Sequence, residues 1–225
     1  MKITWLGHAS FRIEVAGQVL LLDPWLEGNP TFPDERRAEA IAGATAVLVT
    51  HAHGDHASEA PGIARETGAQ LCGQYDWTGW VADNGGPEGV GFNKGGTIRI
   101  GEVAVTMVHA THSSTSGSFA ASEAGYMIEG GGRTLYAMGD TDVMADMAVF
   151  QDLHRPTHAL VPIGGHFTMD STRAAYACKK FFDFEAVIPC HYATFPILEP
   201  NADAFVAKVG PLKVLVPTVM ETIEL

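Results

Sequence analysis

The feature that most constrains this chain is the run H-A-H-G-D-H, in which His51, His53, Asp55 and His56 place four metal-capable side chains within six residues. The run follows an apolar stretch, Ala46 to Val49, that is typical of a buried strand. Alternate side chains of an extended segment point to the same side, so His51 and His53 can face the mouth of a sheet together. Imidazole and carboxylate groups suit zinc and related ions. The run predicts a binuclear metal site, against the alternative of solvated loop histidines.

Length and composition favour one ordinary globular domain. We expect the 225 residues to form a single domain over 1–225, since 46% hydrophobic and 18% charged residues are typical of a soluble protein. No apolar run approaches the roughly 18 residues that span a bilayer. The start, Met1 to Leu6, alternates like a strand and does not resemble a signal peptide, which predicts a cytoplasmic protein with no membrane partner. Three cysteines are too few for a disulfide framework and are expected to be buried free thiols.

The charge of the chain limits its partners. The formal net charge is −12, and the sequence contains no basic block that could bind a polyphosphate. We therefore expect a small-molecule substrate and no nucleic-acid partner. Whether the chain forms a homo-oligomer is left open.

Periodicity predicts an α/β protein in which strands dominate. Alternating or continuous apolar runs bounded by turn residues predict these strands: Lys2 to Leu6, Phe11 to Val15, Val19 to Leu22, Ala46 to Val49, Gln70 to Gly73, Thr97 to Ile100, Val103 to Val108, Gly125 to Glu129, Thr134 to Met138, Ala159 to Pro162, Ala186 to Ile188 and Lys213 to Val216. Helices are predicted at about Ser58 to Thr67, Trp77 to Ala82, Asp170 or Ser171 to Phe182, and Asn201 to Val209. The stretch Asp83 to Gly96 has six glycines, which predicts an irregular and mobile loop.

Further metal-type residues follow the predicted strands. These residues are His109 and His112, Asp140 in the sequence Gly-Asp-Thr, His166, and His191. Together with the H-A-H-G-D-H run they mark five separate strand ends. An α/β architecture places its chemistry at such ends, so we expect these side chains to converge.

In this order the motifs resemble the metallo-β-lactamase superfamily, whose marks are H-x-H-x-D-H, a later His, a Gly-Asp and a final His after a late strand. The runs L-G-H-A-S-F at 6–11, L-L-D-P-W at 21–25, P-I-G-G-H-F-T-M at 162–169 and C-H-Y-A-T-F-P at 190–196 are similar to the UPF0173-type metal-dependent hydrolases. Lactonases that act on ascorbate 6-phosphate are a more distant likeness. The resemblance spans the chain and implies a four-layer αββα sandwich of two mixed sheets flanked by helices.

The resemblance also implies two divalent cations, with zinc preferred and manganese as the alternative. It assigns His51, His53 and His112 to one ion, assigns Asp55, His56 and His191 to the other, and makes Asp140 the bridge. His112 is preferred over His109, because His112 lies in the loop beyond the strand whereas His109 ends the strand and can pack there.

Three more residues are candidates around these ligands. Asp23 matches an acidic motif of the superfamily and would hold a ligand imidazole through its second nitrogen, although Asp is also common in a turn before proline. His8 is assigned with Asp23 to the support of the ligands, and contact with substrate is left open. His166 follows paired glycines that allow close approach of a ligand, or it is a structural histidine.

This ligand set predicts a hydrolase. A metal-bridging hydroxide would cleave an ester, lactone, amide or phosphodiester bond of a small substrate, with Asp55 orienting the attacking group and His166 donating a proton. His53 stands where the diiron oxygen-reducing branch has Glu, which argues against a redox pair. The alternative of a different class is a non-catalytic metal-binding or regulatory module of the same fold. The loops 27–43, 83–96 and 113–122 would set the substrate, which the sequence leaves open.

Overall fold

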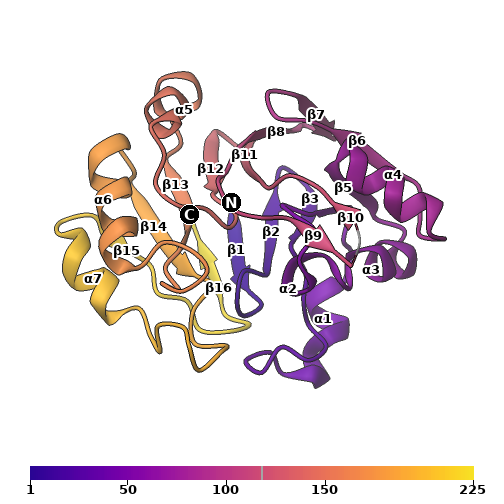
Figure 1. Ribbon diagram of the computed structural model, residues 1–225, viewed down its shortest axis with the longest axis horizontal. Coiled ribbons are helices and arrows are strands. Elements are labelled where there is room, and N and C mark those ends of the chain that lie inside the picture. The colour runs from indigo at the N-terminus through magenta and orange to yellow at the C-terminus, as the bar shows by residue number, and fades with distance from the viewer. Residues whose placement is uncertain (118) are drawn as a thin grey trace.

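The computed structural model describes residues 1–117 and 119–225 and contains two seven-stranded sheets with helices outside them (Figure 1). The predicted specificity loop 113–122 includes Ser118, which lies outside the described residues. Each large sheet is antiparallel in one half and parallel in the other. The expectation of two mixed sheets is confirmed.

The first sheet is formed by the amino-terminal strands and one strand from the end of the chain. Its order is β16 (Thr222–Glu224), β1 (Lys2–Trp5), β2 (Phe11–Val15), β3 (Gln18–Leu22), β4 (Ala46–Leu48), β5 (Gln70–Gln74) and β6 (Gly89–Phe92). The strands β3 to β6 run parallel.

The second sheet follows in the sequence. Its order is β15 (Lys213–Val214), β14 (Ala186–Cys190), β13 (His158–Pro162), β12 (Arg133–Ala137), β11 (Ala124–Gly130), β8 (Val103–His109) and β7 (Thr97–Ile100). The strands β12 to β15 run parallel. A two-stranded ribbon joins β9 (Thr115–Ser116) and β10 (Phe119–Ala120).

The helices cover the outer faces of both sheets (Figure 1). A 3-10 turn, η1 (Asp34–Arg36), leads into the helices of the first half, which are α1 (Arg37–Ile41), α2 (Gly54–Ala57), α3 (Ala60–Thr67) and α4 (Tyr75–Asp83). The second half contains α5 (Asp146–His154), α6 (Ser171–Phe181) and α7 (Asp203–Val209). No helix in the described part of the chain has the length and apolarity needed to cross a bilayer.

The period-two alternation of the strands separates two hydrophobic clusters. In β3, Leu20 and Leu22 pack between the sheets, whereas Leu21 packs beneath the helices of the first half. In β4, Leu48 packs between the sheets and Val47 packs beneath the helices. Successive side chains of a strand point to opposite faces, so each sheet buries both faces. This is the αββα sandwich that the motifs implied.

The glycine-rich stretch 83–96 differs from the prediction, because it contains β6, which pairs in parallel with β5. Glycine serves close packing here and does not produce an irregular loop. A Cβ atom on Gly91 would lie 2.5 Å from Thr78 Oγ1 and 2.8 Å from Tyr75 Cα, both in α4. The strand can approach the helix this closely only because it lacks these side chains.

The two sheets bring their strand ends to one edge of the molecule. Beyond β4, the carbonyl of Thr50 accepts a hydrogen bond from the backbone of Ala124 in β11 at 3.0 Å. On the other side of the edge, the backbone N–H of His191 donates to the carbonyl of His8 at 2.9 Å. These bonds connect the first sheet to the second where the metal-type residues emerge.

The role of the β6 glycines can be tested by stability. We expect Gly91→Ala to lower the free energy of unfolding by about 1–3 kcal/mol, because the added methyl group meets helix backbone. The control is Gly79→Ala within α4, where an added Cβ has no neighbour within 4 Å, and this change should stabilise by up to about 1 kcal/mol. Urea denaturation measures both. Equal stability of Gly91→Ala and the native chain would contradict the packing described.

Candidate metal centre

Seven side chains expected as metal ligands lie together where the strands end. Their ligand atoms fall into overlapping groups in which all atoms lie within 4.8 Å of one another. The groups are His51, His53 and His112; His51, His56 and Asp140; and His8, Asp55, His56 and His191. The expected ligand residues therefore lie close together, and His8 joins the group of Asp55, His56 and His191.

Asp140 occupies the middle of this cluster. Its Oδ2 atom lies 3.0 Å from Nε2 of His191, 3.5 Å from Nε2 of both His56 and His112, and 4.0 Å from Nε2 of His51. Metal–ligand bonds of 2.0–2.2 Å in tetrahedral geometry separate neighbouring ligand atoms by about 3.4 Å. The spacing in the cluster fits coordination of a metal ion of this size.

Asp23 orients two of the imidazoles from behind. Its carboxylate accepts hydrogen bonds from the Thr50 backbone at 2.7 Å, from the Thr50 hydroxyl at 2.6 Å and from His56 Nδ1 at 2.8 Å. The Thr50 hydroxyl has one proton, which it gives to Asp23, so it accepts from His51 Nδ1 at 3.0 Å. Both imidazoles therefore carry a proton on Nδ1 and direct Nε2, the atom that would bind a metal, toward the cluster.

Several polar atoms of the cluster have no protein partner. The buried atoms His56 Nε2, Asp140 Oδ1 and His191 Nδ1 have no hydrogen bond within the described residues. Buried polar atoms are almost always satisfied, and an unsatisfied one costs about 1–3 kcal/mol. A cation near Nε2 of His56 and the carboxylate of Asp140 would satisfy the first two of these atoms, so the donor set fits a metal.

Electrostatics favour the metal-binding states of Asp140 and His51 and draw positive charge to His56. Burial alone would raise the pKa of Asp140, but His191 and His56 beside it bring that pKa well below its usual range. Burial lowers the pKa of His51 well below normal, which favours the neutral imidazole. Burial favours a lower pKa for His56, but the charges of Asp140 and Asp23 outweigh burial and raise that pKa well above its usual value. The buried carboxylates therefore attract positive charge to this point, which a divalent cation can supply in place of a proton.

His8 holds Asp55 in position. The His8 Nε2 atom lies 3.0 Å from Asp55 Oδ2, and Nδ1 lies 2.5 Å from the Thr194 hydroxyl. Burial lowers the pKa of His8 to about 4, so the ring is neutral near pH 7. An ionised carboxylate only accepts, so Nε2 carries the proton and Nδ1 accepts from Thr194. His8 thus has no free lone pair at Nε2 for a metal, which agrees with its predicted supporting role.

Three residues of the site adopt a left-handed backbone. His8, Asp23 and His191 have φ angles of 53°, 45° and 58°, which non-glycine residues rarely adopt. Gly139, before Asp140, has φ 66°, and a Cβ there would lie 2.5 Å from the carbonyl of Ala124. Such conformations persist only where surrounding contacts impose them. The strand ends are therefore shaped to aim these side chains inward.

Two candidate histidines lie away from the cluster. His109 ends β8 and is exposed, with Nδ1 2.9 Å from Asp146 Oδ2, which agrees with the preference for His112. His166, the expected proton donor, is also exposed and lines a neighbouring hollow together with Arg173 and Asp142. The structure does not bring His166 together with the ligands.

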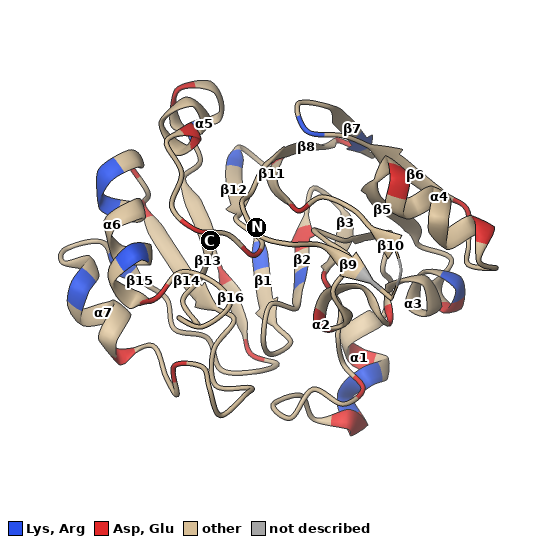
Figure 2. Cartoon of the chain, viewed as in Figure 1, with Lys and Arg blue, Asp and Glu red and all other residues tan. Residues whose placement is uncertain are grey.

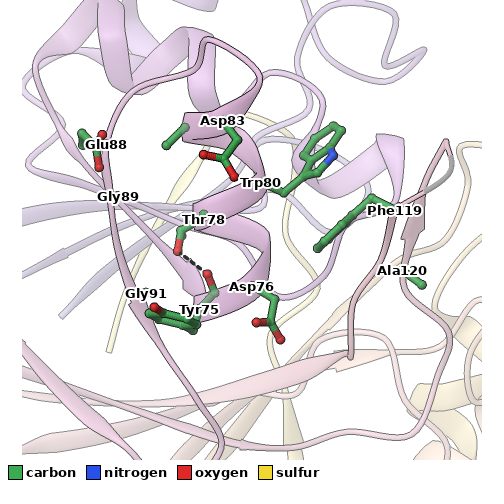
Figure 3. Close-up of a pocket in the computed structure, with 12 residues that line it drawn as sticks. Tyr75, Asp76, Thr78, Trp80, Asp83, Glu88, Gly89, Gly91, Phe119 and Ala120 are labelled. Atoms are coloured by element: carbon green, nitrogen blue, oxygen red, sulfur yellow. Dashed lines mark hydrogen bonds between the residues drawn. The ribbon is translucent and has the colours of Figure 1, made fainter.

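A cavity of about 630 Å³ opens on the cluster. Its lining includes Asp55, His112 and Asp140, and two aromatic side chains, Trp25 and Phe195, stack beside them with ring centroids 5.8 Å apart. A larger hollow of about 730 Å³ lies elsewhere, between α4, β6 and β10 (Figure 3). No histidine is among the described residues that line that hollow, so volume alone does not identify the site.

Sequence reasoning missed several residues of this site. Thr50 immediately precedes the H-A-H-G-D-H run, and its hydroxyl links Asp23 to His51. The aromatic residues Trp25 and Phe195 lie inside two of the quoted motifs. Their position as large aromatic residues in polar loops could have indicated a binding site, since loop aromatics frequently line such sites.

Known proteins are similar in sequence to this chain over its whole length. Residues 2–191, which include all seven ligand candidates, match the family described as Beta-lactamase superfamily domain. The chain is 57% identical over 230 residues to a UPF0173 metal-dependent hydrolase of Dinoroseobacter shibae and 50% identical over 230 residues to one of Paracoccus denitrificans, with 100% of each chain covered. It is also similar to the structure of a metallo hydrolase from Ignicoccus hospitalis, with TM-score 0.87, 34% identity, and coverage of 100% of this chain and 98% of that one.

The link through Thr50 predicts a measurable change in metal affinity. Thr50→Val removes the hydroxyl that orients His51, so we expect zinc affinity to fall by about 10–100-fold. Thr50→Ser keeps the hydroxyl and is the control. Competition with a zinc chelator measures both variants. Native affinity in Thr50→Val would contradict the orienting role.

The lowered pKa of His8 predicts acid sensitivity of the metal-free protein. Below about pH 6.5 the unfolded chain binds a proton at this residue, whereas the folded chain does so only near pH 4. Stability from this group is therefore complete above pH 6.5 and is lost between 6.5 and 4, by an amount of the order of 3 kcal/mol. We expect His8→Gln to flatten this part of the stability curve, measured by urea denaturation with chelator present. Parallel curves for the two proteins would contradict the assignment.

Proposed function

The chain belongs to the β-lactamase superfamily and, within it, to the UPF0173 metal-dependent hydrolases, and on this premise we propose that it hydrolyses a small substrate with two divalent cations held at the cluster. The observation that carries the proposal is the position of Asp140, whose Oδ2 lies within 4.0 Å of four imidazole nitrogens and beside an open cavity. Nitrogen-rich ligation favours zinc, with manganese as the alternative.

The ligands divide into two sets. His51, His53 and His112 would hold one ion, Asp55, His56 and His191 would hold the other, and Asp140 would bridge them. When bound, such a pair of cations acts as a Lewis acid for the scissile group and lowers the pKa of water toward 7. Asp23 and Thr50 keep the imidazoles in the tautomer that this ligation requires.

Asp55 is the residue best placed to handle protons. It lines the cavity, its side chain is 24% exposed, and His8 fixes one of its oxygens. Burial raises its pKa, but the hydrogen bond from His8 and the charge of His56 lower it more, so it is ionised and can accept a proton from the attacking water. It can return that proton to the leaving group. The structure gives no support to His166 in that step, because its side chain lines another hollow.

The alternative of a non-catalytic metal module is less well supported. Structural zinc is usually enclosed by four ligands and has many cysteines. Here seven histidine and aspartate side chains gather beside a cavity of about 630 Å³ that can admit a substrate. Two tightly bound ions with turnover of an ester or phosphodiester would support the enzyme, whereas a folded protein with one ion and no turnover would support the module.

We place this reaction in the cytoplasm. Cys72, Cys178 and Cys190 are all buried free thiols, as predicted, and burial raises the pKa of each. Free thiols suit a reducing compartment. The net charge of −12 supports a small substrate over nucleic acid.

The proposal predicts that loss of single ligands removes both metal and activity. We expect Asp140→Ala and His53→Ala to bind fewer ions, because each change removes a ligand atom, and to lose hydrolysis of a generic ester and phosphodiester panel. The matched control is His109→Ala, an exposed histidine outside the cluster, which should keep both. Metal content is measured by plasma mass spectrometry and turnover by absorbance. Native rates in Asp140→Ala would end the proposal.

A further inference from the structure

We propose that the cavity beside the cluster selects substrates with an aromatic or bulky apolar group next to the scissile carbonyl, and discriminates against phosphorylated or otherwise remotely charged ones. This inference rests on the proposed function for the reacting bond and deepens it by naming the substrate class. The predicted bond classes then narrow to esters, lactones or amides of apolar acids. The residues that line the cavity support it.

Three aromatic side chains from separate loops line the cavity, and two of them, Trp25 and Phe195, form a stacked wall. Trp25 follows β3, Phe167 follows β13 and Phe195 follows β14, and all three line the cavity. The rings of Trp25 and Phe195 stack with an interplanar angle of 18°, so together they present a continuous aromatic surface. Such a surface favours a flat or bulky apolar group.

The wall is fixed to the catalytic machinery. The His8 ring makes edge contacts with Trp25 and Phe195, at centroid distances of 5.4 and 5.5 Å, and the same ring holds Asp55. The Trp25 backbone N–H also donates to Ser10 Oγ at 3.0 Å. A group packed on this wall is therefore held at a defined place relative to Asp55. That arrangement converts apolar binding into orientation of the scissile bond.

Phe167 is the third aromatic residue that lines the cavity, and its side chain is unusually exposed for an aromatic residue. Its side chain is 51% exposed although it lines the cavity. An exposed aromatic in such a position gains from covering by a ligand, since apolar burial stabilises by about 25 cal/mol per Å². The cavity volume of about 630 Å³ lies within the range of small-ligand sites, roughly 300–1,000 Å³.

The cavity lacks a partner for a second anionic group. No lysine or arginine is among the described residues that line it. Arg173 lines an adjoining hollow and is already paired with the carboxylate of Asp142. Figure 2 shows other basic segments on the outer helices α1, α3, α6 and α7. Phosphate is normally recognised by arginine or lysine, so a remote phosphate would lie unpaired against aromatic rings.

Matched hydroxamates test this without requiring turnover. Acetohydroxamate, phenylacetohydroxamate and phosphonoacetohydroxamate share one metal-binding group and differ only in the attached group. We expect the zinc-loaded protein to bind the phenyl compound about tenfold more tightly than the methyl compound, and the phosphono compound no more tightly than the methyl one, by calorimetry. Equal affinity for phenyl and methyl compounds, or tightest binding of the phosphono compound, would overturn the inference.

A pair of variants locates the effect. Phe167→Ala should reduce the advantage of the phenyl compound over acetohydroxamate severalfold, because the larger apolar contact is lost. The control is Tyr176→Ala on α6, where the side chain is 52% exposed and does not line the cavity. That variant should bind all three compounds like the native protein. An equal loss in both variants, or none in Phe167→Ala, would count against the wall.

Turnover separates this inference from the proposed function. With 4-nitrophenyl acetate and 4-nitrophenyl phenylacetate, we expect a higher kcat/KM for the second, reduced in Phe167→Ala. Hydrolysis of both esters at the same kcat/KM would overturn the wall and leave the hydrolase standing. The phenyl preference in binding, with no ester, lactone or amide hydrolysed, would overturn the hydrolase and leave the wall standing.

Discussion

The structure depends on buried carboxylates placed where the two sheets meet. Asp140 is 2% exposed and Asp23 is 1% exposed, and burying an ionised carboxylate without partners costs several kcal/mol. Asp23 is satisfied by three donors, two from Thr50 beyond β4 and one from His56 in α2. Asp140 instead faces imidazole nitrogens, and one of its oxygens has no partner within the described residues. The two carboxylates thus differ in function: one fixes the ligands, and the other creates the demand for positive charge that a metal would meet.

The fold supports this demand with a rigid frame. The left-handed backbone at His8, Asp23 and His191 is held by bonds between strands, including the donation from His191 to the carbonyl of His8. Each such conformation costs about 1–3 kcal/mol and must be offset by its surroundings. Because β3, β4, β12 and β14 end at one edge, the buried core between the sheets supplies that stabilisation. The stability of the core therefore offsets the backbone strain at the site.

The sequence predicted the sandwich and most of the cluster because those features follow from local pattern and motif order. His112 and Asp23 lie where they were expected, for reasons of strand ends and chain direction. His166 does not, because Gly164 packs against the carbonyl of His191 and Gly165 adopts φ 85°, and the turn leaves His166 exposed while Phe167 lines the cavity. The β6 strand was also not predicted, because its glycines allow close packing against α4 and do not mark a loop. Both outcomes depend on three-dimensional packing, against His191 in one case and against α4 in the other, that the residue pattern does not reveal.

Phe167 shows how the site can separate charge from apolar contact. It lines both the metal cavity and the adjoining hollow that contains Arg173 and Asp142. Charged side chains therefore lie beyond one aromatic ring, in water, while the cavity itself keeps its charge at the cluster. In a medium of low polarity a charge interacts more strongly with its neighbours, so the apolar wall strengthens the electrostatics of Asp55 and Asp140 as well as binding the substrate. Under this proposal, a substrate group that covers Trp25, Phe195 and Phe167 would be selected by them and would displace water from beside the cluster.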